Sequence, residues 1–273
     1  MIQNKNTGAG IKDHPVWPVP LEQKPFSQAD VVTASEAYKR RFAGRTGAWF
    51  LEQQAKALLS MLEPWPGASI LDVGGGHGQY TDLLISRGYN LTILGSSPEA
   101  DVQVRELVLS NKCRYITGDL NNYLLPERSY DIVISFRLVN HLDHWKEFLH
   151  KLSRTARNAI IVDFAPLHSF NCTYTMFFWL KRLIEGDTTR HFYVFDERDV
   201  VETFRDSGFR PTARNAQFFL PMVLHRTLKI LPVSMGIETL FRRLTLTDRF
   251  GSPLILRFEP DDAGCFGMIK PAA

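Results

Sequence analysis

The sequence predicts an α/β fold with a central, mostly parallel β-sheet of seven strands. From residue 68 onward, short aliphatic runs alternate with longer stretches in which apolar residues recur at helical spacing, a pattern typical of parallel strands joined by helices. Apolar positions within the runs are nearly continuous, as expected for strands covered by helices on both faces. The five runs that predict the parallel strands are residues 69–73, 90–94, 114–117, 131–135 and 159–163.

Flanking segments add helices and two further strands. Apolar residues at helical spacing predict a helix over residues 50–62, which prolines end before the first strand. Downstream, Asp196 is expected to cap another helix. Strands over residues 210–220 and 253–258 complete the sheet, and a helical stretch over residues 221–246 separates them.

The chain of 273 residues fits one α/β domain with additions. Residues 1–28 are rich in proline and polar side chains, and we expect a poorly ordered or docking arm there. Residues 29–66 are expected to form a helical cap, and residues 67–273 the sheet domain. Two segments exceed a minimal α/β core, residues 172–191 and 221–251, and we interpret them as insertions that cover the substrate.

Composition and charge argue against several classes of protein. The 32 basic and 29 acidic residues give a net charge of +3 and are scattered, so no basic arm for a nucleic acid is predicted. The three cysteines form no CxxC pair, which predicts neither a disulfide framework nor a metal site and favours the cytoplasm. No signal peptide or transmembrane segment is predicted. We expect a small-molecule substrate, while the oligomeric state stays open, a homodimer included.

A glycine-rich loop follows the first predicted strand directly. Gly74, Gly76 and Gly78 stand between this strand and a helix expected to begin near Gln79. Glycines let the backbone turn sharply and approach a ligand, and the N–H groups at the helix start favour a carboxylate or another anion. Asp72, at the strand end, could order the loop by accepting its N–H groups, or reach an ammonium group through water. The loop predicts a cofactor site, with a purely structural turn as the alternative.

This loop resembles the first motif of the class I S-adenosylmethionine-dependent methyltransferases, an acidic residue followed by GxGxG. The resemblance covers roughly residues 50–164, and residues 38–44 look like the N-terminal region of the ubiquinone/menaquinone-type enzymes. Further matches are residues 118–120, 130–135 and 140–142. The resemblance implies a Rossmann-like fold, S-adenosylmethionine as cofactor and methyl transfer as the reaction.

The same resemblance implies which residues bind the cofactor. The three glycines would border its methionine part, and Asp119 would accept a hydrogen bond from the adenine amino group, unless it simply caps a helix. Leu120 and Phe136 would also line the cofactor. Tyr38 and Arg41 would fold over it with the N-terminal helix, and one arginine would meet the methionine carboxylate. A solvated helix face is the alternative for that segment.

One position departs from the family pattern. The second strand normally ends in Asp or Glu, which binds the ribose hydroxyls, whereas this sequence has Gly95 there. Three explanations are open: Ser96 or Ser97 takes over, the site accepts an altered cofactor, or methyl transfer has been lost. We expect Ser96 to bind the ribose, and a plain helix cap is the alternative for this serine.

Three residues are candidates for catalysis. Methyl transfer from a sulfonium is an in-line displacement, so the protein mainly holds the nucleophile against the methyl group and, for some acceptors, removes a proton. Ligands of this topology sit at the carboxyl ends of the strands, which selects His141 after the fourth strand. His191 and Tyr38 are the other candidates. Each histidine has a structural alternative. His141 could be a structural or substrate-contact residue, and His191 could close a lid by hydrogen bonding to a backbone carbonyl.

Aromatic segments favour an apolar acceptor. Residues 174–180 are unusually aromatic, and residues 218–224 repeat this character, which indicates a pocket for a small apolar or aromatic molecule, including a lipid-linked one or a natural product. Core packing is the alternative explanation. Two other functions stay open at this point: a cofactor-binding pseudoenzyme, and an enzyme that uses the same site for a reaction without methyl transfer.

Overall fold

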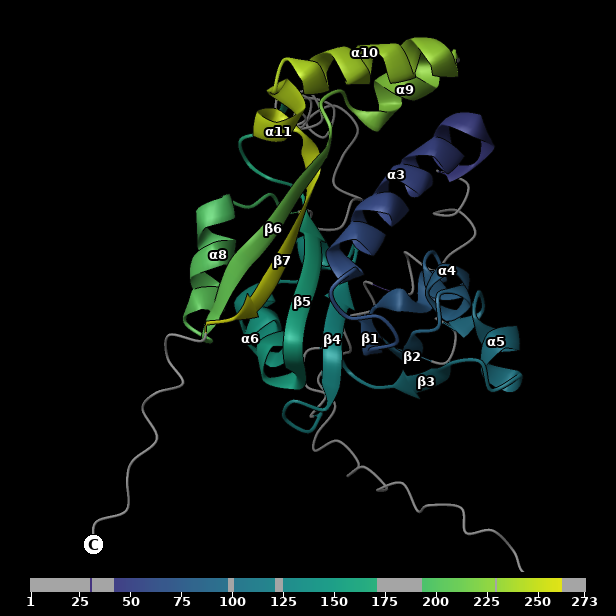
Figure 1. Ribbon diagram of the computed structural model, residues 1–273, viewed down its shortest axis with the longest axis vertical. Helices are drawn as coiled ribbons and strands as arrows, with labels where there is room; N and C mark the ends of the chain where they lie inside the picture. Colours follow the sequence, from purple (N-terminus) through teal and green to yellow (C-terminus); the bar gives the residue numbers. More distant parts are fainter. Residues whose placement is uncertain are drawn as a thin grey trace, which may run out of the picture.

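The computed structural model describes residue 30 and residues 42–97, 101–120, 125–170, 193–228 and 230–261. Its seven strands form one sheet in the order β3-β2-β1-β4-β5-β7-β6 (Figure 1). They are β1 (Ser69–Val73), β2 (Asn90–Gly95), β3 (Arg114–Thr117), β4 (Tyr130–Ser135), β5 (Ala156–Phe164), β6 (Phe209–Phe218) and β7 (Ser252–Pro260). The first five strands pair in parallel, and β7 is antiparallel to both of its neighbours. The predicted mostly parallel, Rossmann-like sheet is confirmed.

Helices lie on both faces of this sheet, as the apolar strands predicted. On one face, α6 (Trp145–Thr155) and α8 (Glu197–Arg205) pack against a core cluster that includes Leu71 and Val133. On the other face, α3 (Gly44–Leu62) and α4 (Thr81–Ser86) pack against a second cluster that includes Ile70. Adjacent residues of β1 thus enter opposite clusters, as side chains alternate along a strand. α5 (Arg105–Leu109) precedes β3.

Strand β3 is less buried than the sequence predicted. Its four residues are exposed or half-buried, because β3 forms the edge of the sheet and pairs with β2 alone. An edge strand has no neighbour on one side, and its side chains reach solvent more easily. The expectation of full coverage is therefore wrong for this strand.

The helices differ from the prediction in two places. After β1 the chain first forms the 3₁₀ helix η2 (Gly75–His77), so that α4 begins at Thr81 and not near Gln79. The single helical stretch predicted over residues 221–246 is three helices, α9 (Met222–Leu228), α10 (Leu231–Arg243) and α11 (Leu246–Phe250). Proline in the first turn of α10 starts a new helix, since its ring has no N–H to continue the preceding one.

These three helices follow β6, at the carboxyl end of the parallel strands (Figure 1). β6 runs in the direction of β5, because both are antiparallel to β7. The predicted cap of α8 is confirmed, since the Asp196 side chain accepts a hydrogen bond from the Arg198 N–H. Within the described ranges, no helix is both long and apolar enough to cross a membrane.

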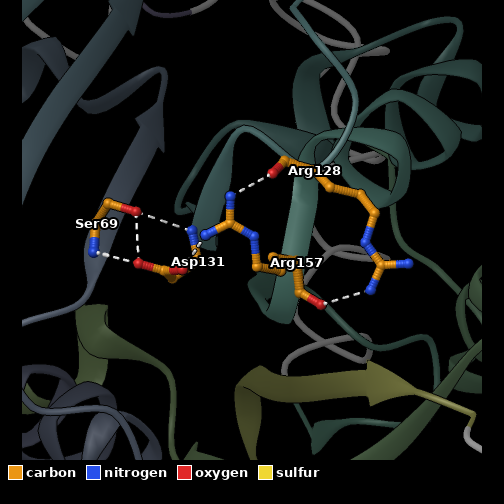
Figure 2. Close-up of polar contacts among 4 residues, drawn as sticks. All are labelled: Ser69, Arg128, Asp131 and Arg157. Atoms are coloured by element: carbon orange, nitrogen blue, oxygen red, sulfur yellow. Dashed lines mark hydrogen bonds and ion pairs between the residues drawn. The ribbon is translucent and has the colours of Figure 1, made fainter.

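A polar cluster joins three strands at the opposite, amino end of the sheet (Figure 2). Asp131 Oδ2 accepts hydrogen bonds from the Ser69 N–H at 2.9 Å and from Ser69 Oγ at 2.7 Å. Its Oδ1 accepts from Arg157 Nη1 at 2.6 Å, while Arg157 Nη2 donates to the Arg128 carbonyl. The hydrogen bonds from Ser69 hold the pKa of Asp131 below its ordinary value. β1, β4 and β5 therefore start from a common anchor.

Candidate active site

The glycine loop lies directly beneath the Asp72 carboxylate. A Cβ added at Gly75 would stand 2.1 Å from Asp72 Oδ2, so no side chain fits between the loop and the acid. Gly74 has φ 81°, and its N–H donates to the Leu94 carbonyl at 2.8 Å. Gly76 is buried in η2, and Gly78 ends that helix. The predicted motif omitted Gly75, although the run of three glycines was a signal for it.

Asp72 is a buried acid that the described residues leave without a hydrogen bond. Its side chain is 1% exposed, and neither carboxylate oxygen has a hydrogen-bond partner in the part of the chain that the structure describes. Burial raises the pKa of this carboxyl from 3.8 to about 7. The expectation that Asp72 orders the loop by accepting its N–H groups is therefore wrong. A cation close to this carboxylate would offset the free-energy cost of burying its charge. The alternative that the sequence offers for Asp72, contact with an ammonium group, therefore stays a prediction.

Arg137, the second residue after β4, connects the site to α3. It has φ 60°, a strained conformation for a residue other than glycine. Its N–H donates to Asp163 Oδ1 at 2.6 Å, and its Nη2 donates to Gln54 Oε1 at 2.9 Å. Its guanidinium also lies 3.9 Å from the centre of the Phe42 ring. Burial raises the pKa of Asp163 to about 6, against the opposing effect of Arg137.

Gln54 also reaches the glycine loop. Its Oε1 accepts from Gln79 Nε2 at 3.1 Å, while the Gln79 N–H donates to His77 Nδ1 at 3.2 Å. Burial, with a smaller contribution from Arg137, lowers the pKa of His77 to about 3. This imidazole is therefore neutral at physiological pH, and it accepts through Nδ1. α3 is thus held against the loop by polar contacts as well as by its apolar face.

The carboxyl end of β2 has no space for the side chain that the family pattern places there. A Cβ added at Gly95 would lie 1.9 Å from Tyr115 Oη, which donates to the Ser97 carbonyl at 2.9 Å. The N–H of Ser96 donates to Asp30 Oδ2 at 2.6 Å. Asp30 is fully buried, and the Ser96 side chain nearly so. Sequence reasoning missed Asp30, because 66 residues separate it from Ser96 and no local pattern links them.

Most predicted cofactor residues come to the same edge of the sheet. Asp72, Ser96 and Asp119 lie within two residues of the carboxyl ends of three neighbouring strands, β1, β2 and β3, and these ends meet at one edge. Leu120 is buried beside Asp119 and joins the core. Phe136 packs its ring against Tyr80, with centroids 4.8 Å apart, so its side chain belongs to the core. Tyr38, Arg41 and His191 lie outside the described residues.

His141 occupies η4 (Val139–His141), in the loop after β4, and is half-buried. The adjacent Asn140 fixes this loop. Its Nδ2 donates to the Tyr193 carbonyl at 2.5 Å, its own carbonyl accepts from the Tyr193 N–H at 2.8 Å, and its Oδ1 accepts from the Ala165 N–H at 3.3 Å. Asn140 therefore joins the chain before residue 171 to the chain after residue 192.

Backbone hydrogen bonds complete this connection. The Phe195 N–H donates to the Ala165 carbonyl at 3.0 Å, and the Leu167 N–H donates to the Phe195 carbonyl at 2.6 Å. Pro166 and Phe195 form an isolated parallel bridge between these bonds. We call this arrangement, from Asn140, residues 165–167 and residues 193–195, the backbone clamp. It holds the two ends of the segment predicted as the first insertion.

The segment predicted as the second insertion is attached to α3 through aromatic rings and a buried acid. Trp49, Phe50 and Phe218 form a small core cluster, and the His225 ring lies 5.6 Å from that of Trp49. Glu238 accepts three hydrogen bonds, each of 2.9 Å, from the N–H groups of residues 219 and 220 and from His225 Nε2. This buried carboxylate is thus satisfied within the fold.

Comparison with known proteins finds a family match over the first five strands of the sheet. Residues 71–159 match the family described as a methyltransferase domain. Over these residues the chain is similar to methyltransferase domains, in line with its resemblance to the class I S-adenosylmethionine-dependent methyltransferases. The methyltransferase domain is similar to malonyl-[acyl-carrier protein] O-methyltransferase of Pectobacterium atrosepticum, with 29% identity over 137 residues, or 48% of this chain and 53% of that protein. The enzyme of the same name from Serratia marcescens is 26% identical over 134 residues, or 49% and 52% of the two chains.

The chain therefore spans about half the length of the curated relatives that it matches. Solved structures share the fold of the methyltransferase domain over more of the chain. Magnesium protoporphyrin IX methyltransferase from Synechocystis, with bound S-adenosylhomocysteine, has a TM-score of 0.57 at 18% identity and covers 84% of this chain and 96% of its own. The 1,6-didemethyltoxoflavin-N1-methyltransferase of Burkholderia thailandensis has a TM-score of 0.53 at 16% identity and covers 90% and 94%.

Proposed function

We propose that this protein transfers the methyl group of S-adenosylmethionine to a small acceptor molecule. Asp72 carries the proposal. A buried carboxylate that the described residues leave without a hydrogen bond stands over a loop whose glycines leave no room for side chains. Such an arrangement suits a cationic group of a ligand that approaches the backbone closely. The ammonium group of S-adenosylmethionine has this chemistry, and the family match favours the same cofactor.

The residues around the loop suit the rest of the cofactor. Arg137 offers a guanidinium for the methionine carboxylate, and Asp119 offers an acceptor for the adenine amino group. The N–H groups of the loop favour anionic atoms. When bound, the cofactor supplies a methyl group activated by its sulfonium. The protein then has to hold an acceptor in line with this group and exclude water.

His141 is the described candidate for a general base. It lies after β4, at the carboxyl edge of the sheet, and the backbone clamp fixes the loop that carries it. A rigid support is what a proton acceptor needs to stay within reach of a hydroxyl or amine on the acceptor. His191 and Tyr38 remain predictions for the same role.

A row of three aromatic rings, one of them exposed, favours an apolar or aromatic acceptor. Phe170 stacks on Phe219 with ring centroids 4.9 Å apart, and Phe219 lies 4.4 Å from Phe241 of α10. Phe170 is 39% exposed, and Phe219 and Phe241 are half-buried. The relatives are named for malonyl-acyl carrier protein, magnesium protoporphyrin IX and 1,6-didemethyltoxoflavin. Because these acceptors differ, we propose that the two insertions, and not the shared domain, select the acceptor.

Titration calorimetry of the full chain with S-adenosylmethionine and S-adenosylhomocysteine tests the first step. We expect micromolar binding of both, and the absence of binding would overturn the proposal. A screen with radioactive S-adenosylmethionine then tests transfer to carboxylic acids, phenols and aromatic amines. Label recovered in a product supports methyl transfer. Conversion of an acceptor without label would instead show a different reaction at the same site.

A further inference from the structure

Strand β2 ends in Gly95, which has no side chain to accept hydrogen bonds from the ribose of a cofactor. The two hydroxyls of a ribose are good hydrogen-bond donors, and a carboxylate that accepts from both provides charge-assisted bonds. Position 95 is a glycine, and any side chain there would have to displace Tyr115 Oη, which lies where its Cβ would stand. Tyr115 is itself held there by its hydrogen bond to the Ser97 carbonyl.

Asp30 brings a carboxylate to this place from outside the sheet. Its Oδ2 accepts from the N–H of Ser96, the residue directly after Gly95, at 2.6 Å. Asp30 is fully buried at this position. The hydroxyls of Ser96 and Ser97 are buried at the same end of β2 and have no hydrogen-bond partner within the described ranges. An acid and two hydroxyls thus gather where the strand ends.

We propose that Asp30 supplies the carboxylate that binds the ribose of the cofactor, in place of an acid at the end of β2. This inference rests on the proposed function, because it assumes that S-adenosylmethionine occupies the site. Ser96 then acts mainly through its backbone N–H, which positions the Asp30 carboxylate. The earlier expectation gave this task to the Ser96 hydroxyl. Cofactor binding would in this way depend on the segment before α3, far from the glycine loop in sequence.

A cycle of two proteins and two ligands tests the contact itself. The proteins are the unchanged chain and Asp30→Asn, which removes the charge with little change in shape. The ligands are S-adenosylhomocysteine and its analogue that lacks both ribose hydroxyls. We expect Asp30→Asn to lower the affinity for S-adenosylhomocysteine by about tenfold to a hundredfold, the effect of losing one or two charge-assisted hydrogen bonds. The affinity for the analogue should fall by less than about threefold, since the analogue has no ribose hydroxyl to donate to residue 30.

A matched control removes the same charge elsewhere. Glu127 is an exposed carboxylate that pairs with Arg154, at the end of the sheet opposite the site. Glu127→Gln should leave the affinity for both ligands unchanged. Thermal unfolding of each variant shows whether a loss of binding follows from a loss of folding.

A rescue variant tests whether the position of the acid can be exchanged. In the Asp30→Asn background, Tyr115→Leu makes space and Gly95→Asp places a carboxylate at the end of β2. We expect this variant to regain at least about tenfold in affinity for S-adenosylhomocysteine over Asp30→Asn with Tyr115→Leu alone. With Asp30 unchanged, Gly95→Asp added to Tyr115→Leu should gain less than about threefold, and an equal gain in both backgrounds would mean that Asp30 does not bind the ribose.

The outcomes separate this inference from the proposed function. Suppose that the unchanged chain binds S-adenosylhomocysteine and that Asp30→Asn lowers the affinity for both ligands equally, or for neither. The proposed role of Asp30 is then wrong, while the proposed function stands. If the unchanged chain binds neither S-adenosylmethionine nor S-adenosylhomocysteine, both are wrong. A loss confined to the ligand with ribose hydroxyls supports both.

Discussion

The two ends of the parallel sheet differ in the hydrogen bonds that they provide to a carboxylate. At the amino end, Asp131 accepts hydrogen bonds from Ser69 and Arg157, which hold its pKa below the ordinary value (Figure 2). At the carboxyl end, Asp72 has no hydrogen bond from the described residues, and burial raises its pKa to about 7. Both ends belong to the same strand, since Ser69 begins β1 and Asp72 lies one residue before its end.

This difference separates stability from function at the two ends of one sheet. A carboxylate with all its partners supplied by the fold contributes to folding, whereas a buried carboxylate without partners costs stability until a ligand supplies them. Glu238 belongs to the first kind, although it lies near the carboxyl edge, because the N–H groups of residues 219 and 220 and His225 Nε2 satisfy it. The lack of partners, and not burial alone, distinguishes Asp72 as a binding residue.

The largest expected effect comes from Asp72→Asn. It should lower the affinity for S-adenosylhomocysteine by about tenfold to a hundredfold, because the ammonium group loses its counter-charge. The same change should not lower the free energy of unfolding at pH 8. The folded pKa lies above the unfolded value of 3.8, so the ionised group costs stability progressively as pH rises through this window. Calorimetry and urea unfolding measure the two quantities, and a large loss of stability would contradict the comparison.

The raised pKa of Asp72 also predicts a pH dependence of binding. At pH 6 the carboxyl is mainly protonated in the unliganded protein, and a bound ammonium group favours ionisation. Binding should release about one proton at pH 6 and almost none at pH 8.5, and affinity should rise about tenfold from pH 6 to pH 8. Calorimetry in buffers of different ionisation enthalpy counts the protons. In Asp72→Asn the release should be absent.

Asp131→Asn should give the opposite result, with a smaller effect. The free energy of unfolding should fall by about 1 kcal/mol at pH 7, because one of the contacts to Ser69 or Arg157 is lost at a partly exposed site. The lowered pKa means that this stability is present above the unfolded pKa and is lost as pH falls through the folded value. The difference between variant and parent should therefore disappear in acid. Cofactor affinity should stay within about twofold.

The smallest effect is expected from an exposed ion pair at the amino end of the sheet. Arg154 and Glu127 form an ion pair there in which both side chains are 68% exposed. Arg154→Gln should change the free energy of unfolding by less than about 0.5 kcal/mol, since exposed pairs are screened by water and salt. A larger loss, measured by urea unfolding, would mean that surface charge, and not the Asp131 cluster, stabilises this end.

The sequence was sufficient for the sheet and for the loop, because both depend on local patterns. Apolar runs located all seven strands to within a few residues, and the glycine motif located Asp72. The break before α10 also had a local signal in its proline. The break after α10 had none, since Thr245 adopts a left-handed conformation that its residue type does not indicate.

The rest of the site depends on contacts between distant segments. Asp30 and Ser96 are 66 residues apart and meet only in the folded chain, and nothing in the sequence around either residue predicts the pairing. The need for glycine at position 75 likewise follows from where the Asp72 carboxylate lies. The Gly95 anomaly was visible in the sequence, but its structural cause, the Tyr115 hydroxyl, was not.

The backbone clamp has an evolutionary consequence. It fixes the chain on both sides of residues 171–192 through Asn140 and through bonds between residues 165–167 and 193–195. The entropy of closing a loop grows only slowly with length, by about 0.6 kcal/mol for each doubling. Insertions, deletions or exchanges between these anchors can therefore accumulate at little thermodynamic cost, so that descendants of this protein could diversify their acceptors while their cofactor chemistry is inherited unchanged.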